Sequence, residues 1–333
     1  MDNETQFAKA SHECRKKAIK SINECFHPKC SEASINSHIL QENGILSQLE
    51  KDGHVYQMEI NLFKKNLFFF RKIGINKAFS FNCFCKTHDN ELFKPIEIGG
   101  IDFTSYKTRL LFTLRIIYNE KFRKIVNLRE CDCLIKNYSK IINVEKLKTQ
   151  IEQEKLGLAD IEKIEQTIWH DLEKQEESFV LQVREIKKKE ICLSAFYTYE
   201  TTKELEDYRI KFGRDKEDTS DIFINIFPYK GKSIFMMGYR KKNEQLVKGY
   251  VNSFLKENEK KLERKLTNLL LFQCETWVTS ESFYNKRIKP CEEYFSYAAE
   301  YSANNLHERQ FFEINLFKDD FCKKINQWKK VLV

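Results

Sequence analysis

Proline and glycine are scarce in this chain, with 4 and 10 copies among 333 residues. Disordered segments are usually rich in both, so this scarcity argues for regular elements joined by short connections. No apolar run reaches the ~18 residues that a membrane span needs. The polar stretch 1–20 also lacks the apolar region of a signal peptide. We therefore expect no membrane segment and a cytoplasmic location.

Several common catalytic signatures are also missing. The chain contains no Gly-x-Ser-x-Gly, no dinucleotide-binding fingerprint and no His-Glu-x-x-His. Each of these motifs is tied to a particular chemistry, so their absence removes the usual sequence evidence for three enzyme classes. No internal repeat of fixed period is apparent, which argues against a solenoid or a propeller.

The composition is that of a globular protein, with 41% hydrophobic and 32% charged residues. The length is sufficient for two domains and a sizeable core. Eleven cysteines raise the question of disulfides. Because disulfide scaffolds are small secreted domains, a long chain rich in lysine and glutamate does not fit that class.

Positive charge is unevenly distributed over the chain, whose net charge is +8. Residues 101–150 hold 11 Lys and Arg against 5 Asp and Glu, whereas residues 151–190 hold 7 against 11. A basic segment beside a metal-binding module is typical of proteins that bind a polyanion such as nucleic acid. The alternative is an ordinary solvated helix face.

Hydrophobic periodicity predicts a mixed α+β architecture. The expected order is helix 5–23, strand 35–40, helical turn 44–50, strands 55–62, 67–73 and 78–81, helix 85–93 ended by Pro95, helices 103–138 and 144–183, strands 191–199, 222–227 and 233–237, and helices 245–272 and 281–306. The two long helices suggest an antiparallel hairpin, Gly213–Ser220 suggests a polar loop, and Pro228–Ser233 suggests a tight turn. We predict domains at 1–100, 101–186 and 187–333.

Two pairs of residues near the N-terminus have the spacing of metal ligands. They are Cys25-Phe-His-Pro-Lys-Cys30 and Cys85-Lys-Thr-His88. Two thiols on a short turn point into one concavity, and ligands three residues apart share one face of a helix. Together the pairs would supply three sulfur atoms and one nitrogen, a closed tetrahedral set. We therefore predict that Cys25, Cys30, Cys85 and His88 bind structural Zn²⁺.

Other interpretations of these residues stay open at this point. His27 lies inside the first turn and could replace one ligand, and Cys83 could compete with Cys85. The four side chains could also be unrelated buried groups in a cysteine-rich chain. The arrangement Cys131-Asp-Cys133 is more often a matter of packing than of metal binding.

Residues 25–93 resemble the HNH-type ββα-metal nuclease domain, a treble-clef zinc finger. In many such domains a Cys-x-x-Pro-Gly-Cys knuckle precedes an Asp-His pair at nearly the distance from Cys30 to His38. Their closing Cys-x-x-Cys or Cys-x-x-His pair is followed at once by a metal-binding histidine. Here Ser37, Ser80 and Asp89 stand where the family has an acidic residue, an asparagine and that histidine. The segment is also similar to uncharacterised bacterial proteins with the same elements.

The resemblance implies a catalytic role for two residues. His38 would be the general base, and Asp89 would bind a catalytic Mg²⁺ or Mn²⁺. Lys86, Arg109 or Arg115 would hold a neighbouring phosphate of the nucleic acid. About twice the common number of residues separates His38 from the closing pair, so additional strands must be inserted between them.

We therefore expect an HNH-like, metal-dependent endonuclease acting on DNA or RNA, or a close derivative, of the kind used in bacterial defence. The alternative is a non-catalytic zinc-binding protein whose C-terminal domain binds a partner protein or a small signal molecule. In either case helices 103–183 offer a surface for a partner protein or for oligomerisation.

Overall fold

The computed structural model describes residues 3–60, 68–198, 220–274, 276–298 and 314–332. Two compact units emerge, and each is formed by two segments of the chain. Unit 1 consists of Met1–Ile39 and Ser80–Glu176, and unit 2 of Leu40–Phe79 and Glu177–Val333. The expected α+β class is confirmed, whereas the predicted borders at residues 100 and 186 stay predictions. None of the helices in the described ranges is long and apolar enough to cross a membrane.

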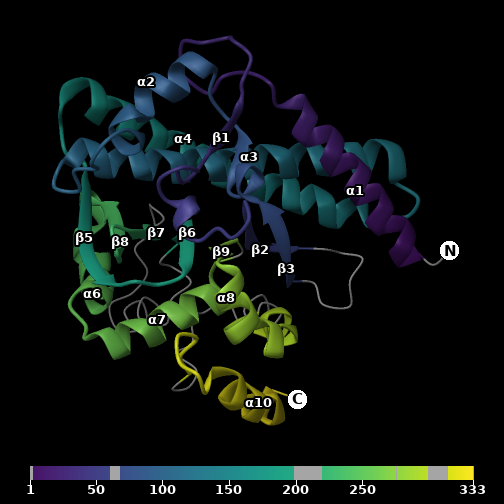
Figure 1. Ribbon diagram of the computed structural model, residues 1–333. Coiled ribbons are helices and arrows are strands. Elements are labelled where there is room, and N and C mark those ends of the chain that lie inside the picture. The colour runs from purple at the N-terminus through teal and green to yellow at the C-terminus, as the bar shows by residue number, and fades with distance from the viewer. Residues whose placement is uncertain (1–2, 61–67, 199–219, 275, 299–313, 333) are drawn as a thin grey trace. The chain divides into compact units, whose positions relative to one another are not determined.

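Unit 1 is mainly helical and carries a small sheet (Figure 1). Its elements are α1 (Asn3–Ser21), β1 (Asn36–His38), β4 (Ser80–Asn82), α2 (Lys86–Glu97), α3 (Tyr106–Tyr138) and α4 (Val144–Lys174). The side chains of Ser105 and Asn143 cap α3 and α4 by accepting the backbone N–H three residues ahead. Such caps satisfy donors that the first helical turn leaves unpaired. The predicted helical hairpin is thus present as α3 and α4, and α1 and α2 pack against α3.

Two predicted helix ends differ from the structure. Pro95 does not end α2, which continues to Glu97. Proline has no N–H and therefore removes one backbone hydrogen bond near the helix end. Burial of the neighbouring Phe93 and Ile96 nevertheless keeps the last turn packed. The long helix after residue 144 ends at Lys174, because Gln175 adopts a left-handed conformation with φ 57°.

Unit 2 contains a seven-stranded sheet in the order β3-β2-β9-β6-β7-β8-β5, with antiparallel pairing throughout. The strands are β2 (His54–Ile60), β3 (Phe68–Gly74), β5 (Phe179–Lys187), β6 (Ile191–Thr198), β7 (Asp221–Tyr229), β8 (Lys232–Arg240) and β9 (Val278–Thr279). The predicted turn between β7 and β8 is confirmed: Lys230 and Gly231 have φ of 46° and 80°, as a two-residue hairpin turn requires. The predicted polar loop 213–220 lies almost wholly outside the described residues.

Unit 2 also contains helices and short helical turns. They are α6 (Glu244–Leu255), α7 (Glu259–Phe272), α8 (Glu281–Phe283) and α10 (Phe321–Leu332), with short single turns η1 (Leu46–Gln48), η2 (Ile75–Lys77), η4 (Lys241–Asn243), η5 (Tyr284–Ile288) and η6 (Lys289–Cys291). Helix α6 contacts β5 and β8 and buries Val247, Val251 and Phe254. The predicted helical stretch 245–272 is therefore two helices, and part of the stretch 281–306 lies outside the described residues.

Candidate metal centre

The four predicted zinc ligands lie together in unit 1. Cys25 and Cys30 belong to the turn between α1 and β1, which the bond from the Cys30 N–H to the His27 carbonyl closes at 3.1 Å. Cys85 is the N-cap residue of α2, and His88 lies in its first turn. Their four ligand atoms all lie within 4.8 Å of one another. The predicted grouping is therefore present.

Backbone hydrogen bonds explain how the two pairs meet. The N–H of Phe26 donates to the carbonyl of Cys83 at 2.8 Å, and that of Ile35 donates to the carbonyl of Phe84 at 2.8 Å. The cysteine turn is thus tied on both sides to the two residues that precede Cys85. Strands β1 and β4 continue this pairing, with Ser37 opposite Phe81.

The spacing of the ligand atoms fits a tetrahedral zinc ion. With Zn–S and Zn–N bonds of ~2.3 and ~2.05 Å, a tetrahedron places two sulfurs about 3.8 Å apart and a sulfur and a nitrogen about 3.6 Å apart. The Sγ atoms of Cys30 and Cys85 are 3.9 Å apart. Nδ1 of His88 lies 3.5 Å from Sγ of Cys25 and 3.3 Å from Sγ of Cys85. These three distances depart from the tetrahedral values by no more than about 0.3 Å.

The protonation chemistry of the thiols also bears on metal binding. Burial raises the pKa of Cys25 to about 11. The pKa of Cys85 is lowered, chiefly because its sulfur accepts the backbone N–H of His88 at the start of α2. A metal ion that binds these sulfurs as thiolates would release protons on binding, so its affinity would fall as the pH falls.

Two aromatic side chains of unit 1 lie one after the other beside the ligand His88. The His27 ring stacks on the His88 ring at a centroid distance of 3.8 Å, with 2° between the planes. Trp169 of α4 meets His27 edge-on at 5.0 Å. His27 is not a member of the ligand cluster, so the alternative in which it replaces a ligand is not adopted by the structure. Cys83 is likewise outside the cluster and buried.

A hydrogen-bond network extends from the cysteine turn into the helical hairpin. The Tyr118 hydroxyl donates to the carbonyl of Phe26 or to Glu165, at 3.3 and 2.8 Å, and accepts the Trp169 indole N–H at 2.8 Å. Lys121 pairs with the same glutamate at 2.5 Å. The sequence gives little indication of these residues, because their only signal is a set of polar side chains on otherwise apolar helix faces.

The two predicted catalytic residues occupy different elements of unit 1. His38 ends β1, is half-buried, and lies directly opposite Ser80 in the pairing with β4. Asp89 lies in the first turn of α2, and its Oδ1 is 3.8 Å from Nη2 of Arg115. The cluster of metal-ligating side chains found among the described residues contains neither of them. Their catalytic roles stay predictions.

The three predicted phosphate-binding residues differ strongly in exposure. Lys86 is exposed at the start of α2, and Arg109 bonds the backbone carbonyls of Thr104 and Ser105. Arg115 is only 3% exposed, pairs with Glu97, and lies 4.1 Å over the Phe93 ring. The phosphate-binding roles of all three residues stay predictions, and for Arg115 the role would require opening this buried ion pair with Glu97.

Comparison of the chain with protein-family models, with curated proteins and with solved structures finds no match.

Proposed function

We propose that this is a zinc protein in which Cys25, Cys30, Cys85 and His88 hold one structural Zn²⁺ within a frame of the treble-clef type. The supporting observation is the convergence of the four ligand atoms within 4.8 Å. Three sulfurs and one nitrogen form a complete tetrahedral set and leave no open position for substrate, as in structural rather than catalytic zinc sites. The ion would join the cysteine turn to the start of α2.

Elemental analysis of purified protein tests this proposal. We expect about one zinc per chain in the parent and a large loss of zinc in Cys30→Ser, because one of four ligands is removed. Cys131→Ser is the control, since Cys131 is also a free cysteine of unit 1 but lies outside the ligand cluster. Zinc-free parent protein, or equal zinc in both variants, would refute the site.

We further propose that the same frame acts on nucleic acid, as an HNH-like endonuclease or a close derivative. The order of elements supports this proposal: a cysteine turn, strand β1, strand β4 and helix α2 follow one another in unit 1. The intervening Leu40–Phe79 belongs to unit 2, so the long spacing leaves the β-β-α order of the finger intact. His38 and Ser80 face each other across the two strands, at the positions that the resemblance assigns to the site.

In this proposal each residue has a defined task. His38, when neutral, would take the proton of a water molecule as that water attacks a phosphodiester. Asp89 would hold Mg²⁺ or Mn²⁺, which supplies neutralisation of the charge that develops on the phosphate oxygens. The exposed Lys86, on the same turn of α2, would attract a neighbouring phosphate.

One observation favours the non-catalytic alternative. The Asp89 carboxylate is 14% exposed and close to the buried Arg115, an arrangement that can serve packing alone. In that case unit 1 is a structural zinc module, and unit 2 binds a partner protein or a small signal molecule.

A nicking assay separates the two functions. DNA and RNA substrates are incubated with zinc-loaded protein and Mg²⁺ or Mn²⁺. We expect cleavage by the parent and by His170→Ala, and its loss in His38→Ala. His170 is a suitable control because it lies on α4 of the same unit and is exposed. Equal cleavage by the parent and His38→Ala, or none by the parent, would leave the structural zinc protein as the better description.

A further inference from the structure

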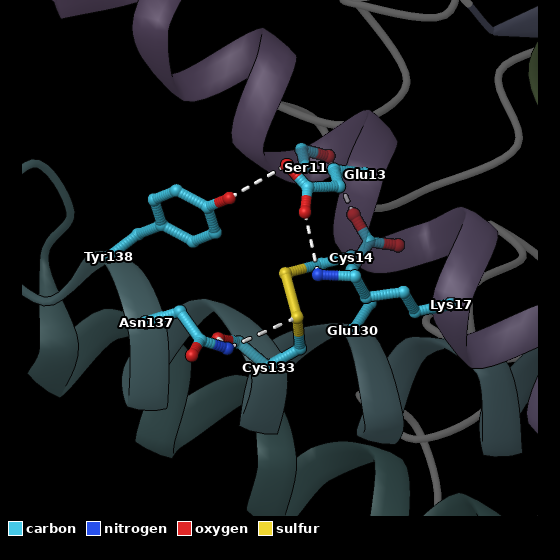
Figure 2. The surroundings of a disulfide bond; sticks show 8 residues. All are labelled: Ser11, Glu13, Cys14, Lys17, Glu130, Cys133, Asn137 and Tyr138. Carbon is cyan, nitrogen blue, oxygen red and sulfur yellow. Dashed lines mark hydrogen bonds and ion pairs between the residues drawn. A yellow bond between two sulfur atoms is a disulfide. The ribbon is translucent and has the colours of Figure 1, made fainter.

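A disulfide joins the first helix of unit 1 to its longest helix. Cys14 of α1 and Cys133 of α3 are bonded, although 119 positions separate them in the sequence. Figure 2 shows the bond between the two helices, with polar side chains of both helices beside it. The sequence predicted neither this covalent link nor a second disulfide of the chain, Cys291–Cys322 in unit 2.

Contacts other than the disulfide also hold α1 on α3. Cys14, Ala10 and Leu134 form a buried apolar cluster, which further apolar side chains of both helices extend. The hydroxyl of Ser11 donates to Glu130 at 2.6 Å, and that of Tyr138 donates to Glu13 at 2.9 Å (Figure 2). The helix pair can therefore assemble without the bond, and its closure adds a constraint to contacts that already exist.

The remaining cysteines of unit 1 point to a reducing environment. Cys25, Cys30 and Cys85 are free thiols gathered at the metal centre, and Cys83 and Cys131 are free and buried. Zinc-binding thiols are kept reduced where thiol reductants are abundant, and disulfides in such compartments are mostly transient or redox-sensing. A disulfide and a thiol-based zinc centre in one unit thus indicate a bond that forms and breaks.

We propose that Cys14–Cys133 is a reversible clasp, that is, a disulfide that thiol–disulfide exchange breaks and re-forms. Its state sets how firmly α1, which precedes the zinc-binding turn in the chain, is held on α3. The proposal rests on the proposed metal site, whereas the exchange of the two sulfurs can be measured whether or not zinc is bound.

The exchange proceeds through the more accessible sulfur. Cys14 is fully buried, whereas Cys133 is half-buried. A low-molecular-weight thiolate such as glutathione attacks Sγ of Cys133, and the Cys14 sulfur leaves and takes up a proton. A second glutathione then attacks the mixed disulfide, frees the Cys133 thiol and yields glutathione disulfide. The Asn137 amide, 3.6 Å from Sγ of Cys133, can donate to this sulfur during both steps.

The end of α1 is connected to the metal centre through the backbone. Helix α1 ends at Ser21, and Cys25 follows four residues later. In between, the carbonyl of Ile22 accepts the Asn82 amide of β4 at 3.1 Å, and that of Asn23 accepts the Ser34 N–H at 2.9 Å. Because only three residues separate the end of α1 from Cys25, a displacement of α1 would pull against these bonds on the segment that enters the cysteine turn, and opening the clasp should ease the release of zinc.

The experiment equilibrates the full-length, zinc-loaded parent in mixtures of reduced and oxidised glutathione. Alkylation and mass spectrometry then report the state of each cysteine. We expect Cys14 and Cys133 to convert together between disulfide and thiols. Amide exchange in α1 should be about tenfold faster in the reduced form, because the covalent constraint on local opening is lost. The clasp is overturned if Cys14 and Cys133 keep one redox state in every mixture, or if amide exchange in α1 is equally fast in the oxidised and reduced forms.

Zinc transfer to a chelator tests the connection to the metal centre. The Cys14→Ala/Cys133→Ala double variant imitates the open clasp without reductant, and Cys131→Ala is the control on the same helix. We expect several-fold faster transfer from the double variant than from the control or the parent. Equal rates overturn the connection. Protein that holds no zinc overturns the proposed metal site, while the state of the cysteines and the exchange in α1 still decide the clasp.

Discussion

The buried Arg115 allows a quantitative prediction, because its ion pairs should contribute measurably to the stability of unit 1. Its guanidinium is 3% exposed, pairs with Glu97, and lies 3.8 Å from the Asp89 carboxylate. In Arg115→Met, the side chains of Asp89 and Glu97, which are 14% and 22% exposed, lose the cation that both carboxylates face. Removing one partner of a buried ion pair costs about 3–5 kcal/mol. Because both carboxylates keep some access to water, we expect the lower end, about 3 kcal/mol.

The matched substitution Asp89→Asn should be milder. At 3.8 Å and an effective dielectric constant of ~20, the Coulomb attraction is about 4 kcal/mol. Most of this gain is offset by the cost of removing the charges from water, and Arg115 keeps Glu97. We therefore expect a net loss of about 1 kcal/mol in the free energy of unfolding.

Urea unfolding of zinc-loaded protein, followed by far-ultraviolet circular dichroism, measures both effects. Arg123→Met on the same helix is the control, since its side chain is 35% exposed and pairs across one turn with Glu120. It should cost less than about 0.5 kcal/mol. The reasoning fails if Arg115→Met is as stable as this control, or if Asp89→Asn costs as much as Arg115→Met.

Three further predictions concern both units. Gly238→Ala should lose about 1–3 kcal/mol of stability, because a Cβ there would lie 2.4 Å from Cδ2 of Leu181. Gly249 is exposed on a helix, and a Cβ added there meets no atom within 4 Å, so Gly249→Ala should instead gain about 0.5–1 kcal/mol. Urea unfolding compares the two variants. Burial opposes ionisation of Glu263, but bonds from Lys189 and Asn315 prevail and hold its pKa below the ordinary value. The ionised Glu263 therefore stabilises the fold above the ordinary carboxylate pKa, and this effect is lost as the pH falls through the lower pKa of the folded state. We expect Glu263→Gln to flatten the acid side of the curve of unfolding free energy against pH. An unchanged curve would contradict this. Removal of zinc by a chelator should increase proteolysis within unit 1 far more than within unit 2, and equal cleavage of both units would argue against a local structural ion.

Short-range features of this protein could be predicted from the sequence because their causes lie within a few residues. The two ligand pairs depend on spacings of five and three positions, and one turn or one helical face suffices to align each pair. The hairpin turn at Lys230 and Gly231 follows equally from local backbone preferences. Long amphipathic patterns also identified α3, although the same signals placed the end of α4 too late.

The remaining features depend on which distant segments meet, and only the tertiary structure decided them. Spacing alone does not reveal that β1 pairs with β4 while the residues between them join another sheet. Nor does it show which of eleven cysteines bond, since Cys14 and Cys133 become neighbours only when α1 packs on α3. Arg115 appeared to be a surface cation for the same reason: burial of a charged side chain is set by the partners that surround it, and those come from elsewhere in the chain.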